Sequence, residues 1–153
     1  MGLRRKGREI VLQTLYSLDF DHESALTERE VDREMFEPIL NNIFETNSIK
    51  PTSRIYPFCN ELIVSVIENL QTIDNLIKTH LEHWNIDKLG VLDRNLLRLA
   101  IADILYQNTP PPIAIDEAVE IAKKFCCDKS SKLINGVLDH IAKDLPQQPH
   151  KTE

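Results

Sequence analysis

Apolar residues recur at helical spacing along most of this chain. Val11, Leu15 and Leu18 follow an i, i+4, i+7 pattern, which places them on one face of a helix. Residues 92–106 are apolar almost all round, which is typical of a helix at the centre of a domain. No segment alternates apolar and polar residues for long, so we expect no β-sheet. Helices are predicted over about residues 5–19, 27–44, 56–70, 72–81, 92–106, 114–125 and 129–145.

Capping residues and prolines mark the boundaries of these helices. Thr27 and Glu30 form a T-x-x-E capping box at the start of the second helix. Pro38 is expected to end or kink that helix, because proline lacks the backbone N–H of a helix interior. The three prolines at 110–112 predict a rigid, non-helical link, and Pro146 is expected to stop the last helix.

The pattern predicts one all-α domain over residues 1–145, followed by a flexible tail over 146–153. We expect about seven helices arranged as two stacked helical bundles. Asn135 and Gly136 fall inside the last predicted helix. A glycine there indicates close packing of the backbone against a neighbour, and an RNA contact is the alternative.

Composition narrows the class of protein. Hydrophobic residues make up 42% of the chain and charged residues 27%, as in a globular domain. No apolar stretch is long enough to span a bilayer and the N-terminus lacks a signal-peptide pattern, so we expect a cytoplasmic protein. The three cysteines, Cys59, Cys126 and Cys127, contain no CxxC pair and are interpreted as reduced, mostly buried thiols.

The sequence contains no glycine-rich phosphate loop, no GxSxG and no HExxH. We therefore expect a binding protein rather than an enzyme, with no cofactor and no metal. His80 and His83 could share a metal, but without a second pair of ligands ordinary histidines are favoured. The adjacent Cys126 and Cys127 are favoured as packing residues over a redox pair. A carboxylate cluster is interpreted as a solvated helix face: Asp116, Glu117 and Glu120.

Positive charge is concentrated at the N-terminus, in Arg4, Arg5, Lys6 and Arg8. The net charge of the chain is −6, so without these four side chains the remainder carries −10. Cations at a helix N-terminus are slightly unfavourable, because that end already has partial positive charge. Stability therefore does not explain the cluster, whereas attraction to an external polyanion does.

An aromatic residue shares a side of the first helix with this cluster. At about 100° per residue, Arg5 and Tyr16 project about 20° apart and lie about 16 Å from one another along the axis. Cations that meet phosphates and a ring that stacks on a base suit single-stranded RNA. The alternatives are a disordered cationic start and a tyrosine that only packs its ring.

Three blocks of sequence together resemble the NusB family of bacterial transcription antitermination factors. They span about residues 4–144 in the family order. The blocks are RRKGRE at 4–9 with Leu15-Tyr16-Ser17; Trp84, Asp87, Leu89-Gly90 and Asp93-Arg94 running into LRLA at 97–100; and AIDEAVEIAKKF at 114–125 with Lys132 and NGVLD at 135–139.

The resemblance implies an all-α fold of two helical subdomains. It also implies binding to boxA RNA of nascent ribosomal RNA transcripts as a heterodimer with NusE, a small-subunit ribosomal protein, within the RNA polymerase antitermination complex. The family's acidic NusE-facing positions fall on Asp87 and Asp93. Its RNA-contacting positions fall on Arg4, Arg5, Lys6, Arg8 and Tyr16.

Two positions depart from the family pattern. Cys126 stands where glycine is frequent, so the turn there is expected to differ. Lys129 stands where an acidic residue also occurs; with Lys132 it either extends the RNA surface or is simply solvated. A protein-only module, such as a homodimer that buries its own basic end, is the second hypothesis. A detached domain of an RNA methyltransferase is the third, and the absence of a catalytic domain argues against it.

Overall fold

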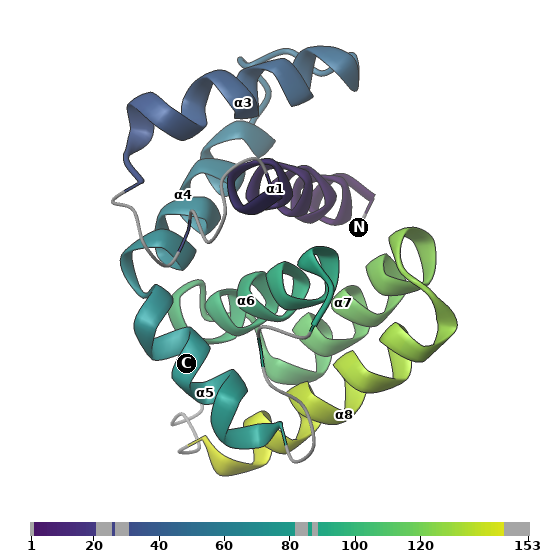
Figure 1. Cartoon of the computed structure of the whole chain (residues 1–153). Coiled ribbons are helices and arrows are strands. Elements are labelled where there is room, and N and C mark those ends of the chain that lie inside the picture. The colour runs from purple at the N-terminus through teal and green to yellow at the C-terminus, as the bar shows by residue number, and fades with distance from the viewer. Residues whose placement is uncertain (1, 21–25, 27–30, 82–85, 87–88, 146–153) are drawn as a thin grey trace, which may run out of the picture.

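The computed structural model of the chain describes residues 2–20, 26, 31–81, 86 and 89–145. Within these ranges the chain forms helices and no strand, which confirms the predicted all-α class (Figure 1). The helices are α1 (Gly2–Phe20), α3 (Arg33–Thr46), α4 (Ile55–Glu68), α5 (Leu70–His80), α6 (Val91–Tyr106), α7 (Pro111–Phe125) and α8 (Asp128–Asp144).

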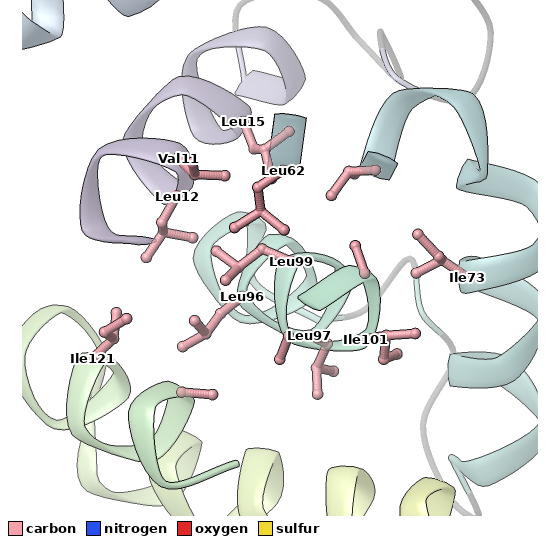
Figure 2. Close-up of a cluster of buried hydrophobic side chains, with 14 of the residues drawn as sticks. Val11, Leu12, Leu15, Leu62, Ile73, Leu96, Leu97, Leu99, Ile101 and Ile121 are labelled. Atoms are coloured by element: carbon pink, nitrogen blue, oxygen red, sulfur yellow. The ribbon is translucent and has the colours of Figure 1, made fainter. Parts of the chain in front are cut away.

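The helices form two groups that share α6. Helices α1, α3 and α4 pack together on one side, and α5, α7 and α8 lie on the other (Figure 1). Helix α6 contacts α1, α4, α5, α7 and α8, which is the central position that its apolar sequence predicted. Its buried apolar side chains meet those of α1, α4 and α7 in one hydrophobic core; they are Leu96, Leu97, Leu99, Ala100, Ile101 and Ala102 (Figure 2).

Helix α1 begins at Gly2, three residues before the predicted start. The N-terminal cations therefore lie within its first two turns rather than ahead of them. Because successive helical residues point in different directions, the four cations face different neighbours.

Two predictions about proline need correction: Pro38 does not end its helix, and Pro111 and Pro112 are helical. Pro38 lies inside α3, which continues to Thr46. Pro38 falls in the second turn on the exposed side, so the carbonyl that loses its N–H partner faces solvent. Pro111 and Pro112 do not form a link but occupy the first turn of α7, where the missing N–H has no partner in any case.

The close packing predicted at Gly136 was also wrong. Gly136 is exposed on α8, and a Cβ at this position would have no atom within 4 Å. No helix in the described ranges is long and apolar enough to cross a membrane. Four predictions concern residues outside the described ranges: the capping box at Thr27 and Glu30, the second histidine at His83, the partner-facing Asp87, and the tail at 146–153.

Candidate nucleic-acid interface

The basic first turns of α1 point in several directions. Arg4 is exposed, and its guanidinium lies 5.2 Å from the centre of the Phe58 ring on α4. Lys6 is half-buried, with its Nζ 3.9 Å from Glu9 Oε1. Neither cation is held tightly by a carboxylate, so both are available to an external anion.

Arg5 is held by a carboxylate of α7. Its Nε donates to Glu117 Oε2 at 2.6 Å and its Nη2 to Oε1 at 3.2 Å, a two-bond fork. The hydrogen bond raises the pKa of Arg5 and lowers the pKa of Glu117. The Arg5 side chain is still 41% exposed. A phosphate that binds Arg5 must therefore share it with Glu117.

Arg8 faces inward. Its Nε donates to Asp103 Oδ2 on α6 at 2.7 Å, and the two residues are 4% and 1% exposed. Its guanidinium also lies 5.3 Å from the centre of the Phe58 ring, on which Arg4 rests as well. The expectation that stability does not explain the basic cluster is therefore wrong for Arg8. A phosphate contact by Arg8 stays a prediction, and one that requires this buried pair to rearrange.

Sequence reasoning missed two members of this region. Lys124 on α7 is exposed and donates to Glu9 Oε1 at 2.9 Å, so it joins the cations around α1. Glu117 was interpreted as part of a solvated face, but it is buried against Arg5. Both depend on α7 packing beside α1, which helical periodicity does not reveal. We call Arg4, Arg5, Lys6 and Lys124 the basic end.

At the opposite end of α1, Tyr16 stacks on Phe20. Their ring centres are 5.2 Å apart and the ring planes are 11° from parallel. Tyr16 is half-buried and Phe20 is exposed. The pair therefore presents an aromatic face to solvent on the side of α1 where a base-stacking tyrosine was expected.

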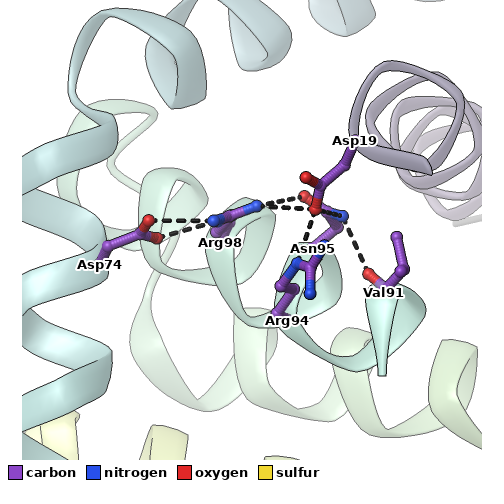
Figure 3. Close-up of polar contacts among 6 residues, drawn as sticks. All are labelled: Asp19, Asp74, Val91, Arg94, Asn95 and Arg98. Carbon is purple, nitrogen blue, oxygen red and sulfur yellow. Dashed lines mark hydrogen bonds and ion pairs between the residues drawn. The ribbon is translucent and has the colours of Figure 1, made fainter. Parts of the chain in front are cut away.

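A polar network fixes this end of α1 to α6. Asp19 Oδ2 accepts hydrogen bonds from Arg94 at 2.6 Å, Asn95 at 2.9 Å and Arg98 at 3.1 Å (Figure 3). Arg98 also forks onto Asp74 of α5 at 2.8 and 2.9 Å. Burial alone would raise the pKa of Asp19, but hydrogen bonds from Arg94 and Asn95 and the charge of Arg98 hold it below its ordinary value.

Asp93 lies in the first turn of α6, half-buried, and its Oδ2 accepts a hydrogen bond from Ser130 of α8 at 2.8 Å. Burial and the hydrogen bond to Asp93 raise the pKa of Cys126 to about 12. Asp93 therefore helps to hold the start of α8, and one of its two carboxylate oxygens already accepts a hydrogen bond from within the protein. Its predicted role toward a partner protein is not tested by this geometry.

The first two turns of α8 carry the remaining predicted RNA-binding residues. Lys129 and Lys132 are exposed on α8. Arg94 of α6 bonds Asp19 and Asp93 of α6 bonds Ser130, so the end of α1 and the start of α8 both contact the first turn of α6. The three cysteines are free thiols, but only Cys59 is buried; Cys127 is exposed, which corrects the expectation of mostly buried cysteines.

Comparisons with known proteins agree with this architecture. The NusB family model matches residues 5–143. The transcription antitermination protein NusB of Thermodesulfovibrio yellowstonii is 39% identical over 142 residues, 92% of each chain. That of Citrifermentans bemidjiense is 38% identical over 143 residues, 93% of this chain and 95% of the relative.

Solved structures show the same arrangement of helices. T. maritima NusB superposes with a TM-score of 0.76 at 36% identity, over 92% of this chain and 91% of that one. A chain in a structure of the antitermination factors NusB and NusE in complex with double-stranded RNA gives a TM-score of 0.78 at 27% identity. It covers 95% of this chain and 99% of that one. With the family model matching nearly the whole chain, this protein belongs to the NusB family.

Proposed function

We propose that this chain is a transcription antitermination factor that binds boxA RNA of nascent ribosomal RNA transcripts. It acts as a heterodimer with the small-subunit ribosomal protein NusE and promotes processive elongation by RNA polymerase. The observation that carries the proposal is the basic end, set on an otherwise acidic protein. The structure of NusB and NusE with RNA supports both partners, since this chain shares that NusB's fold.

The geometry divides the proposed RNA contacts into two kinds. Arg4, Arg5 and Lys6 are solvent-accessible and bind phosphates by charge. Tyr16 stacks on an unpaired base. Lys129 and Lys132 extend the surface from the first two turns of α8. Arg8 is proposed to support RNA binding mainly by fixing the position of α1, because its guanidinium is buried against Asp103.

The salt dependence of RNA binding tests this assignment. We expect the Arg4→Ala, Lys6→Ala double variant to flatten the slope of log affinity against log salt by about 1 to 1.5, at about 0.7 per phosphate on single-stranded nucleic acid. A Lys143→Ala variant is the matched control, because Lys143 is an exposed cation on α8 that pairs with Asp139 of the same helix, away from α1. Equal slopes for the wild type and the double variant would overturn the assignment.

Asp87 and Asp93 are proposed to face a basic surface of NusE. Charges at the rim of an interface affect association rate and specificity more than folding. Asp93→Asn removes the charge yet leaves an oxygen for Ser130, so it isolates the partner contact from the anchoring of α8. We expect slower association with NusE, measured by surface plasmon resonance, at a nearly unchanged melting temperature. An unchanged association rate would remove Asp93 from the interface.

The purified chain and the same RNA also test whether the protein forms a homodimer. A homodimer that buries the basic end would protect Lys6 and Lys124 and block RNA. Sedimentation of the purified chain with and without RNA separates this hypothesis from the RNA-binding one. A dimer that dissociates only when RNA is added would show that RNA and the second copy of the chain bind the same residues of the basic end.

A further inference from the structure

Phe20 is the most exposed large apolar side chain of the described ranges. It is 60% exposed, against 52% for Ile113 and 41% for Leu3. Its ring lies nearly parallel to that of Tyr16, with the centres 5.2 Å apart, and it is not part of the hydrophobic core. Burial of apolar area therefore does not explain the ring, which leaves a flat aromatic face open to solvent.

The backbone that carries Phe20 is held in place. Its neighbour Asp19 is buried and bonded by Arg94, Asn95 and Arg98 of α6. These bonds anchor the last turn of α1, so the aromatic pair is fixed before a ligand arrives. Preorganisation of this kind lowers the entropy cost of binding.

The surroundings of Phe20 favour a nucleic acid as the ligand. On a helical projection, Arg5, Tyr16 and Phe20 fall within about 60° of one another, so one side of α1 carries a cation and then two rings. Arg5 and Phe20 are about 22 Å apart along the axis, a span for several nucleotides of an extended strand. The start of α8, with the exposed Lys129, meets the same end of α6. Two rings are also too small a patch for a stable protein interface, which buries about 800 Å² on each partner.

We propose that Phe20 is an RNA-binding residue whose open face stacks on an unpaired base, extending the site of Tyr16 beyond the residues assigned above. The inference rests on the proposed function and deepens it. The basic end holds the phosphates of the strand, and the Tyr16–Phe20 pair takes its bases. A flat ring binds any base by its π-face, so Phe20 adds affinity with little sequence preference.

The test is RNA binding by a Phe20→Ala variant of the full chain, measured by fluorescence anisotropy with a single-stranded boxA RNA. Loss of one stacking partner lowers affinity by about 5-fold to about 150-fold. The salt slope stays at the wild-type value, because no charge is removed. Ile113→Ala is the matched control, since Ile113 is similarly exposed but lies on α7.

Two further arms identify stacking as the cause. Phe20→Trp restores wild-type affinity and Phe20→Leu does not, because leucine keeps apolar area but lacks a flat ring. The second arm uses a series of RNAs in which each nucleotide in turn lacks its base. For one RNA of the series the wild type should bind more weakly than it binds the intact RNA, and Phe20→Ala should lower the affinity for that RNA no further. Full affinity in Phe20→Leu, or additive effects at every abasic position, would overturn the inference.

Wild-type RNA affinity in Phe20→Ala together with weakened NusE binding would reassign the ring to the protein partner and also overturn it. Failure of the wild-type chain to bind RNA, alone and with NusE, would instead overturn the proposed function. The melting temperature of each variant shows that the comparison is made between folded proteins.

Discussion

The guanidinium of Arg8 and the carboxylate of Asp103 form an ion pair that is almost fully removed from solvent. Asp103 Oδ1 also accepts a hydrogen bond from Thr109 at 2.6 Å, so both carboxylate oxygens have partners. A buried pair of this kind adds little net stability over apolar residues, but the loss of one member leaves an uncompensated charge. The pair therefore fixes how α1 and α6 meet.

Arg8→Ala should lower the free energy of unfolding by about 3 to 5 kcal/mol, because it leaves Asp103 buried without its counter-charge. Arg4→Ala is the control, since Arg4 is exposed and surface substitutions change stability by about 0.5 kcal/mol or less. Urea unfolding of the two variants measures the difference. Equal stabilities would show that Asp103 finds another partner when Arg8 is removed.

The position of Arg8 in the helical pattern indicates that it is buried, although a count of positive charges does not show this. Arg8 is three residues before Val11, seven before Leu15 and ten before Leu18, so it continues the buried stripe of α1. Counting positive charges grouped Arg8 with its exposed neighbours, whereas its helical position separates it from them. The partner itself could not be predicted, because Asp103 lies 95 residues away and only the packing of α1 on α6 brings it close.

At the level of the helix pair, α1 and α4 meet at Gly7. A Cβ at this position would come within 2.8 Å of Ile55 Cγ1 and 3.1 Å of Phe58 Cδ2. Phe58 is itself covered by the guanidinium groups of Arg4 and Arg8, so it has little room to move. Glycine therefore allows the close approach of α1 to α4.

Gly7→Ala and Gly136→Ala should change stability in opposite directions. The gain in helix propensity is about 1 kcal/mol at either position. At Gly7 overpacking costs about 1 to 3 kcal/mol, so the variant should be destabilised by up to about 2 kcal/mol. At Gly136 nothing opposes the gain, and the variant should be stabilised by about 0.5 to 1 kcal/mol. Urea unfolding measures the free energy of unfolding of both variants. Stabilisation by Gly7→Ala would contradict the packing argument.

Helices α5 and α8 are joined by a histidine that bonds at both ring nitrogens. His80 Nδ1 lies 2.8 Å from the carbonyl oxygen of Leu76, and Nε2 lies 2.7 Å from Asp144 Oδ2. Both partners are acceptors, so the two bonds together require the protonated ring. Burial lowers the pKa of His80, but the bonds to Leu76 and Asp144 outweigh it and raise the pKa above its ordinary value of 6.5.

A raised pKa makes the contact sensitive to pH in a definite direction. The stability that it contributes is fully present below about pH 6.5 and is lost as pH rises through the pKa of the folded protein. Thermal unfolding between about pH 5.5 and about pH 8.5 should therefore show a stability difference between wild type and Asp144→Asn that narrows as pH rises. A constant difference across that range would show that His80 does not titrate with Asp144.

At the scale of the whole molecule, the sequence predicted the helices well and their neighbours poorly. Periodicity identified α6 as central because its residues are apolar all round. It could not show that α7 lies beside α1, and so it missed the placement of Lys124 and Glu117. The proline errors have a related cause, since a proline is tolerated where the structure leaves the affected carbonyl exposed or the N–H unused.

The charge distribution opposes RNA binding by the free chain. The basic end offers four cations, and two of them are bonded to Glu117 and Glu9. The net charge of the protein is −6, so the acidic remainder repels a polyanion at long range. A partner that covers acidic residues at Asp87 and Asp93 would remove part of this repulsion.

We therefore predict that RNA binds the NusE heterodimer more tightly than the chain alone. Linkage then requires RNA to tighten the protein–protein contact by the same factor, because the two binding steps close one thermodynamic cycle. Coupling between sites is commonly about 5- to 150-fold, which titration calorimetry resolves. RNA is titrated into the chain with and without NusE, and NusE is titrated with and without RNA. Asp93→Asn supplies the control, because it should lower the coupling while leaving the RNA affinity of the free chain unchanged or slightly higher. Equal RNA affinities for the chain and the heterodimer would show that this protein binds RNA as an independent module, since a partner that shares the RNA surface or removes its repulsion must change that affinity.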